Sequence, residues 1–101
     1  MDSPVVGVAA AHNAILPDAY TAAVTSSAAD DAALLEALRA QTTYEAKVDA
    51  LQFQLHREHS EAQARELARA ERVLERARAK VAECKAAVKR SSARLARVES
   101  E

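Results

Sequence analysis

The sequence predicts an all-α protein that forms either one long coiled-coil helix or an antiparallel helical hairpin, preceded by a less regular N-terminal segment. Three observations lead to this fold class. The chain has one glycine and two prolines in 101 residues, it is rich in Ala, Glu, Arg, Leu and Lys after residue 30, and its apolar residues repeat every seven positions. Only three residues are aromatic, so a large globular core is not expected.

Residues 1–26 differ in composition from the rest of the chain. They are rich in Ala, Val, Ser and Thr, almost uncharged, and contain all three helix-breaking residues, Pro4, Gly7 and Pro17. One structure for this segment is a short helix from about Val5 to Leu16, which ends because the residue before a proline avoids the α region. The other is an extended arm that becomes ordered against a partner. The sequence leaves both open.

Residues 27–59 are predicted to form a first amphipathic helical segment. Ser27 is the expected start, because its hydroxyl can accept a hydrogen bond from a free amide of the first turn, and because Asp30 and Asp31 complement the positive end of the helix dipole. The heptads of this segment define a first seam, with Leu34, Gln41, Val48 and Leu55 at position a and Ala37, Tyr44 and Leu51 at position d.

Residues 60–101 are predicted to form a heptad-patterned, basic coiled-coil segment. Leucine and valine recur over five heptads without a slip, which predicts a left-handed supercoil. This second seam consists of Leu67, Leu74, Val81, Val88 and Leu95 at position a and Ala70, Ala77, Cys84, Ser91 and Val98 at position d.

The two seams do not continue into one another. Leu55 and Leu67 are twelve residues apart, which places them about 120° apart around a helix. One explanation is a turn near His56–Ser60 that folds the chain into a hairpin, and Ser60 followed by Gln63 has the pattern of a capping box. The other is a continuous helix that changes its contact face. The segment lacks Gly, Pro, Asn and Asp, which favours the continuous helix.

A partner helix is expected in either case, because an exposed leucine or valine stripe would cost about 1.5–3 kcal/mol per side chain. Phe53 lies at position f, away from the first seam, and predicts a second contact surface. The predicted partner-helix interface consists of Leu34, Tyr44, Val48, Leu51, Leu55, Leu67, Ala70, Leu74, Ala77, Val81, Cys84, Val88, Leu95 and Val98.

The second seam favours a heteromeric assembly. Its large residues at a and small residues at d differ from the Leu-at-d pattern of parallel dimers. A parallel homodimer would also place Glu66 against Glu71 and Lys80 against Lys85, which are repulsive pairs. We therefore expect an antiparallel arrangement or a different, more acidic partner strand.

No catalytic, cofactor-binding or metal site is predicted. His56 and His59 have a spacing that can bind a metal, but no third ligand is evident. Cys84 at a d position is expected to pack as a small apolar residue. The sequence lacks the alternation of strands, loops and helices that could form a cleft around a nucleophile and its base.

The charge and the aromatic content of the chain distinguish three further classes of partner: an acidic protein surface, nucleic acid and a membrane surface. Residues 61–101 hold eleven basic and seven acidic side chains, but the two signs are interleaved, as on the exterior of a solvated coiled coil. Docking on an acidic protein surface is therefore favoured over nucleic-acid binding. A membrane-surface helix is disfavoured because neither Trp nor Phe follows Phe53.

The expected location is cytoplasmic, with cytoskeletal association. A single cysteine fits a reducing compartment, and the lack of Lys or Arg before Arg39 argues against a signal peptide. The longest apolar run, Val5–Ala11, is much shorter than the ~20 residues of a membrane span. The expected function is that of a non-catalytic structural or scaffolding subunit in a larger, heteromeric coiled-coil complex of cytoskeletal, ciliary, tethering or segregation type. The alternative is a basic helical protein associated with nucleic acid.

Overall fold

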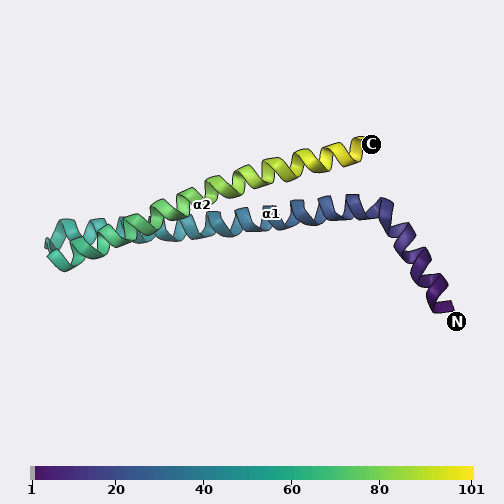
Figure 1. Ribbon diagram of the computed structural model, residues 1–101. Helices are drawn as coiled ribbons and strands as arrows, with labels where there is room; N and C mark the ends of the chain where they lie inside the picture. The colour runs from purple at the N-terminus through teal and green to yellow at the C-terminus, as the bar shows by residue number, and fades with distance from the viewer. Residues whose placement is uncertain (1) are drawn as a thin grey trace.

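The protein is an antiparallel hairpin of two long helices (Figure 1). The computed structural model describes the backbone of residues 2–101 and the side chains of residues 18–101. Helix α1 spans Asp2–Glu58 and helix α2 spans Glu61–Ser100, and the described residues form no strand. The predicted all-α class is therefore confirmed. A helix of 40 residues, the length of α2, extends for about 60 Å.

Helix α1 does not begin where the sequence predicts. Ser27 lies inside α1, which is already helical at Asp18, so the expected start at Ser27 is wrong. Alanines on both sides of Ser27 favour the helix strongly, and no glycine or proline interrupts it between Asp18 and Glu58. Residues 2–26 are part of α1, which continues through Pro17, so the expected helix end at Leu16 is wrong and the segment is not an extended arm. Its ordering against a partner stays a prediction.

Two residues reverse the chain between the helices. His59 adopts a left-handed conformation with φ of 52°, and its N–H donates to the carbonyl of Leu55 at 2.8 Å, which ends α1 with an αL cap. Ser60 is extended and is the N-cap of α2, where its Oγ accepts a hydrogen bond from the N–H of Gln63 at 3.4 Å. Gln63 Nε2 also donates to Glu58 Oε2 at 3.1 Å, which links the two helix ends.

The favoured continuous helix is therefore wrong, and the hairpin is the observed structure. The predicted cap at Ser60 is confirmed, although Gln63 turns its side chain to Glu58 and does not complete the reciprocal arm of a capping box. A left-handed residue other than glycine costs about 1–2 kcal/mol. Each leucine or valine that the chain reversal buries contributes about 1.5–3 kcal/mol, so a few such residues outweigh the strain at His59.

The first and second seams face each other along the hairpin, and they form two apolar clusters. The angle of about 120° between the two seams applies only to a single continuous helix. In the hairpin each seam lies on its own helix, so both can face the same interface. The cluster near the turn contains Val48, Leu51, Leu67, Ala70 and Leu74, with Tyr44 and Leu55 packed against it. The cluster farther from the turn contains Ala37, Val81 and Cys84, with Leu34 packed against it.

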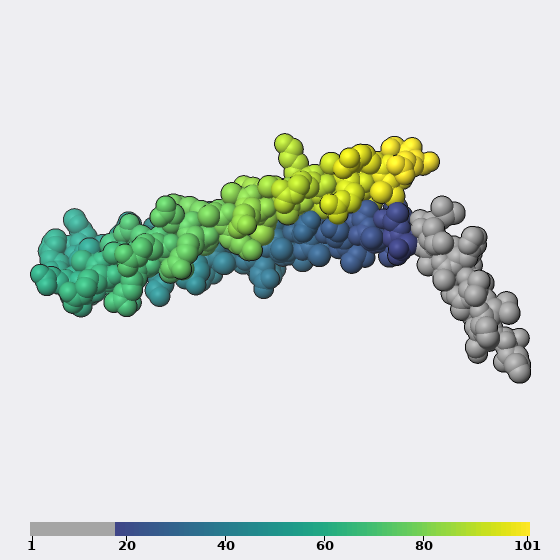
Figure 2. Space-filling model, in the orientation of Figure 1, coloured from purple at the N-terminus to yellow at the C-terminus, as the bar shows by residue number. Residues whose placement is uncertain are grey.

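Polar residues mark the limits of these clusters. Gln41 occupies an a position between them, where its Nε2 donates to Glu45 Oε1 at 3.0 Å. Toward the open end, where the C-terminus lies, Ser91 is 2% exposed and its hydroxyl donates to the carbonyl of Val88 at 3.2 Å. Ala23 on α1 is equally buried at 2%. The helices are thus in contact from the turn to the open end, as the space-filling view also shows (Figure 2).

Candidate partner-helix interface

Ten of the fourteen residues of the predicted interface belong to the two apolar clusters between the helices of this chain. Half of them are buried and the other half are only partly buried. The buried residues are Val48, Leu51, Leu67, Ala70, Leu74, Val81 and Cys84. The half-buried residues are Leu34, Tyr44, Leu55, Ala77, Val88, Leu95 and Val98. Contact of these residues with a second protein stays a prediction.

Helix α1 of the same chain supplies the first helix that covers the second seam. The cover is incomplete, because two helices meet along one line and leave a groove on each side of it. Large apolar residues such as Leu95 and Val98 remain half-exposed for this reason.

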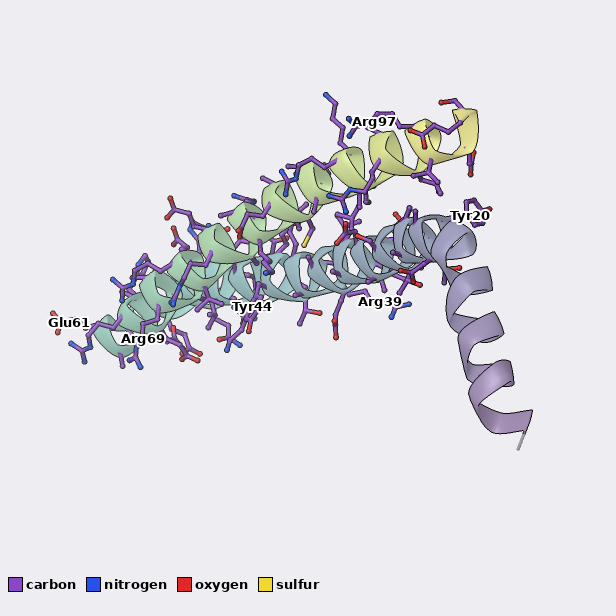
Figure 3. The ribbon with its side chains drawn as sticks, turned by 45° about the vertical axis from the view of Figure 1, so that its right-hand side comes forward. Tyr20, Arg39, Tyr44, Glu61, Arg69 and Arg97 are labelled. Carbon is purple, nitrogen blue, oxygen red and sulfur yellow. The ribbon has the colours of Figure 1, made fainter. Side chains whose placement is uncertain are left out.

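One of these two grooves has an apolar floor and a cationic rim, and we call it the basic groove. It consists of two adjoining hollows of about 220 and 330 Å³, which share Tyr44 and Val73. The floor also includes Ala37, Ala40, Ala70 and Ala77. The charged residues around it are Lys47, Glu66, Arg69, Arg76 and Lys80, a balance of four cations to one anion. Figure 3 shows Tyr44 and Arg69 in the half of the hairpin nearer the turn.

The groove on the other side of the seam has the opposite charge, and we call it the acidic groove. Its floor contains Val48 and Leu74, and positions e and b of both helices form its walls. The charged residues are Glu45, Asp49, Glu71, Arg72, Glu75 and Arg78, a balance of four anions to two cations. The hairpin therefore presents faces of opposite charge.

A third apolar surface runs along the outside of α1, and we call it the outer stripe. The large apolar residues that are exposed in the described part of the chain all belong to α1: Tyr20, Val24, Leu35, Leu38 and Phe53. At 100° per residue these five side chains fall within about 60° of one another around the helix. Phe53 is 64% exposed, and Arg57 Cζ lies 5.8 Å from its ring centroid.

The outer stripe was only partly visible in the sequence. Phe53 was identified from its f position, and its role as a second contact stays a prediction. Leu35 and Leu38 occupy positions b and e, which a heptad count assigns to the polar exterior. Leu35 and Leu38 lie on the same side of α1 as Phe53 because a straight helix has a period of 3.6 residues, and this period can be read from the sequence.

The residues considered for chemistry lie apart from one another. The His56 and His59 rings are 6.4 Å apart at the turn, tilted by 55°. Cys84 is buried in the cluster farther from the turn. In the part of the chain that the structure describes, no three His, Cys, Asp or Glu side chains converge as a metal site would require. The described helices also contain no stretch that is both long and apolar enough to span a bilayer.

Comparison of the chain with family models, curated proteins and solved structures found no match.

Proposed function

We propose that this chain is a non-catalytic structural subunit that contributes its two helices to a larger, heteromeric coiled-coil assembly. The supporting observation is the incomplete cover of the apolar seam. Seven of the fourteen residues of the predicted interface remain half-buried in the hairpin, and they extend from Leu55 near the turn to Val98 near the open end. Further helices laid against the hairpin would bury them, at about 25 cal/mol per Å² of apolar surface removed from water.

Charge supports partners of a different sequence. Helix α2 carries eleven basic and six acidic side chains, whereas residues 18–58 of α1 carry three basic and seven acidic ones. Copies paired along α2 would bring two cationic exteriors together. Other helical subunits with acidic exteriors, or an acidic protein surface such as a cytoskeletal lattice, would be attracted to it. Ciliary, tethering and segregation complexes belong to the same proposed class of assembly.

The test is the composition of the native complex. The tagged chain, expressed in its own cells, is expected to co-fractionate with other helical proteins at a fixed ratio. The paired substitution Leu95→Asp with Val98→Asp removes apolar seam residues at the open end, and we expect it to release those partners. A matched control, Ser92→Asp with Ala96→Asp, adds the same two charges at exposed positions of the same turns and should keep them.

Two results would contradict the proposal. One is a native protein that elutes as the isolated hairpin or together only with its own copies. The other is a seam variant that keeps its partners as well as the control does. Circular dichroism of both variants must show the same helicity, so that loss of partners is not loss of fold.

Nucleic-acid association is the second candidate, and the cationic excess of α2 favours it. The interleaved glutamates oppose it, because each lies close to the phosphates that neighbouring arginines would contact. Titration of the hairpin with duplex DNA and heparin at several salt concentrations separates the candidates. The structural proposal expects no salt-dependent binding at moderate ionic strength.

A further inference from the structure

The basic groove combines an apolar floor with a local excess of positive charge. Tyr44, Val73 and four alanines form the floor, and the rim has four cations and one anion, all of them exposed. Alanine side chains are short, and the distance at which two helices pack depends on the side chains at the contact. The floor therefore leaves room for a further helix to lie close along the hairpin.

This positive charge is confined to the middle of the hairpin. Glu66 limits it toward the turn, and Glu36, next to the groove residue Ala37, adds an anion at the other end. Beyond Lys80, positions c, d and g of α2 continue into a further hollow of about 440 Å³. The charges there are balanced, and they are Asp30, Lys80, Glu83 and Arg90. From Glu66 to Lys80, α2 extends for about 21 Å, which is about four helical turns.

From these observations we infer that the basic groove binds an acidic amphipathic helix of another subunit. The inference rests on the proposed function, and it names the kind of segment through which a partner would attach. The apolar face of that helix packs on Tyr44, Val73 and the alanines, and carboxylates along its edges form charge-assisted hydrogen bonds with the rim cations. Burial of apolar surface supplies the affinity, and opposite charge selects the partner.

The positions of the rim cations specify the partner further. Arg69, Arg76 and Lys80 belong to α2, whereas α1 contributes Lys47. The edge of the partner helix that faces α2 should therefore carry more acidic residues than the edge that faces α1. Arg69 and Arg76 are two helical turns apart, about 10.5 Å, so Glu or Asp residues at a seven-residue spacing would meet both.

Other occupants match the groove less well. The exposed apolar side of α1 in a second copy has mixed charge, with two cations and two anions, which are Arg39, Arg57, Asp31 and Asp49. Two basic grooves in contact would repel each other. A nucleic acid would bind the cations through its phosphates, but these offer nothing apolar to the floor around Tyr44. The groove is open along its length, whereas a small molecule needs enclosure.

The test titrates the isolated full-length chain with two synthetic peptides of about 18 residues, or about five helical turns. The acidic peptide carries Leu and Ala on one helix face and Glu along both edges of that face. The permuted peptide has the same composition without the helical period. Side-chain bridges on the far face keep both peptides helical, because isolated helices of this length are marginal in water. Binding is followed by fluorescence anisotropy, and sedimentation velocity measures self-association of the chain.

Two matched variants locate the binding site. The rim variant is Arg69→Glu with Arg76→Glu, which reverses two exposed cations of the basic groove. The control is Arg72→Glu with Arg78→Glu, which makes the same charge change at the acidic groove on the same helix. We expect the wild-type chain and the control to bind the acidic peptide, more weakly at high salt, and the rim variant to bind it at least about tenfold more weakly.

Four results would overturn the inference. They are an acidic peptide that does not bind the wild-type chain, a permuted peptide that binds as tightly as the acidic one, equal loss of binding in the rim variant and the control, and self-association of the wild-type chain that the rim variant loses. The third would make net charge alone responsible, and the fourth would assign the groove to a second copy. Equal helicity of all variants in circular dichroism excludes unfolding as the cause.

The titration and the co-fractionation of the native complex are separate measurements. A native complex with other helical proteins, but no binding of the acidic peptide, would remove only the basic groove as a docking site. Peptide binding together with a native protein that elutes as the isolated hairpin would remove the proposed function.

Discussion

Substitution of His59 by glycine is predicted to stabilise the hairpin. His59 is exposed, has φ of 52°, and ends α1 with a left-handed residue. A residue with a Cβ atom in this conformation costs about 1–2 kcal/mol, and glycine removes that cost. Glycine also makes the unfolded chain more flexible, which lowers the unfolding free energy by about 0.5–1 kcal/mol. The net gain in unfolding free energy is about 0.5–1 kcal/mol.

The comparison of His59→Gly with His59→Ala makes the prediction sharper. In the hairpin, Ala keeps the left-handed strain, so the Gly variant should be about 0.5–1 kcal/mol more stable than the Ala variant. In a continuous helix the order reverses, because a central glycine costs about 1 kcal/mol relative to alanine. The sign of the difference therefore identifies the structure at residue 59.

The assay is thermal and urea unfolding followed by circular dichroism, at concentrations where the chain is monomeric. A gain of 1 kcal/mol corresponds to about 4–8 °C in Tm for a domain of 60–100 residues. A glycine variant that melts below the alanine variant would refute the reversal of the chain at His59. It would also remove the basis for both grooves, since they exist only between two antiparallel helices.

Three further predictions concern other parts of the hairpin. Leu74→Ala, in the cluster near the turn, should lower the unfolding free energy by about 2–5 kcal/mol in urea titrations, whereas Leu35→Ala on the outer stripe should change it by less than about 1 kcal/mol. Equal losses from both would contradict the assignment of Leu35 to the surface. Ser60→Ala should lower the unfolding free energy by about 1 kcal/mol, because the cap needs an acceptor for the Gln63 amide. Ser60→Asp should keep most of the wild-type stability, because its carboxylate can accept the same hydrogen bond. If Ser60→Ala leaves the unfolding free energy unchanged, the cap is excluded. Cys84 is 6% exposed, so its alkylation by iodoacetamide, followed by mass spectrometry, should be slow and should accelerate in Leu74→Ala, where the hairpin opens more often. Rapid alkylation of the wild-type chain would place Cys84 at the surface.

The candidate interface shows the limit of a heptad analysis. Positions a and d predict the residues of the two apolar clusters between the helices, since the period of an apolar stripe is a local property of the chain. The grooves beside the seam could not be assigned in this way. Val73 and Ala40 belong to the basic groove only because α2 lies antiparallel to α1, which brings their positions to the same side of the seam.

By itself, the sequence determined the helical class, the two seven-residue apolar patterns and the cap at Ser60, because each depends on residues within a few turns of one another. The tertiary structure decided the direction of the chain after Glu58. Local signals favoured a continuous helix, since no glycine marks a turn and His59 must adopt a strained conformation. Burial of leucines and valines from both seams outweighs that strain, and this gain exists only between segments that are distant in the sequence.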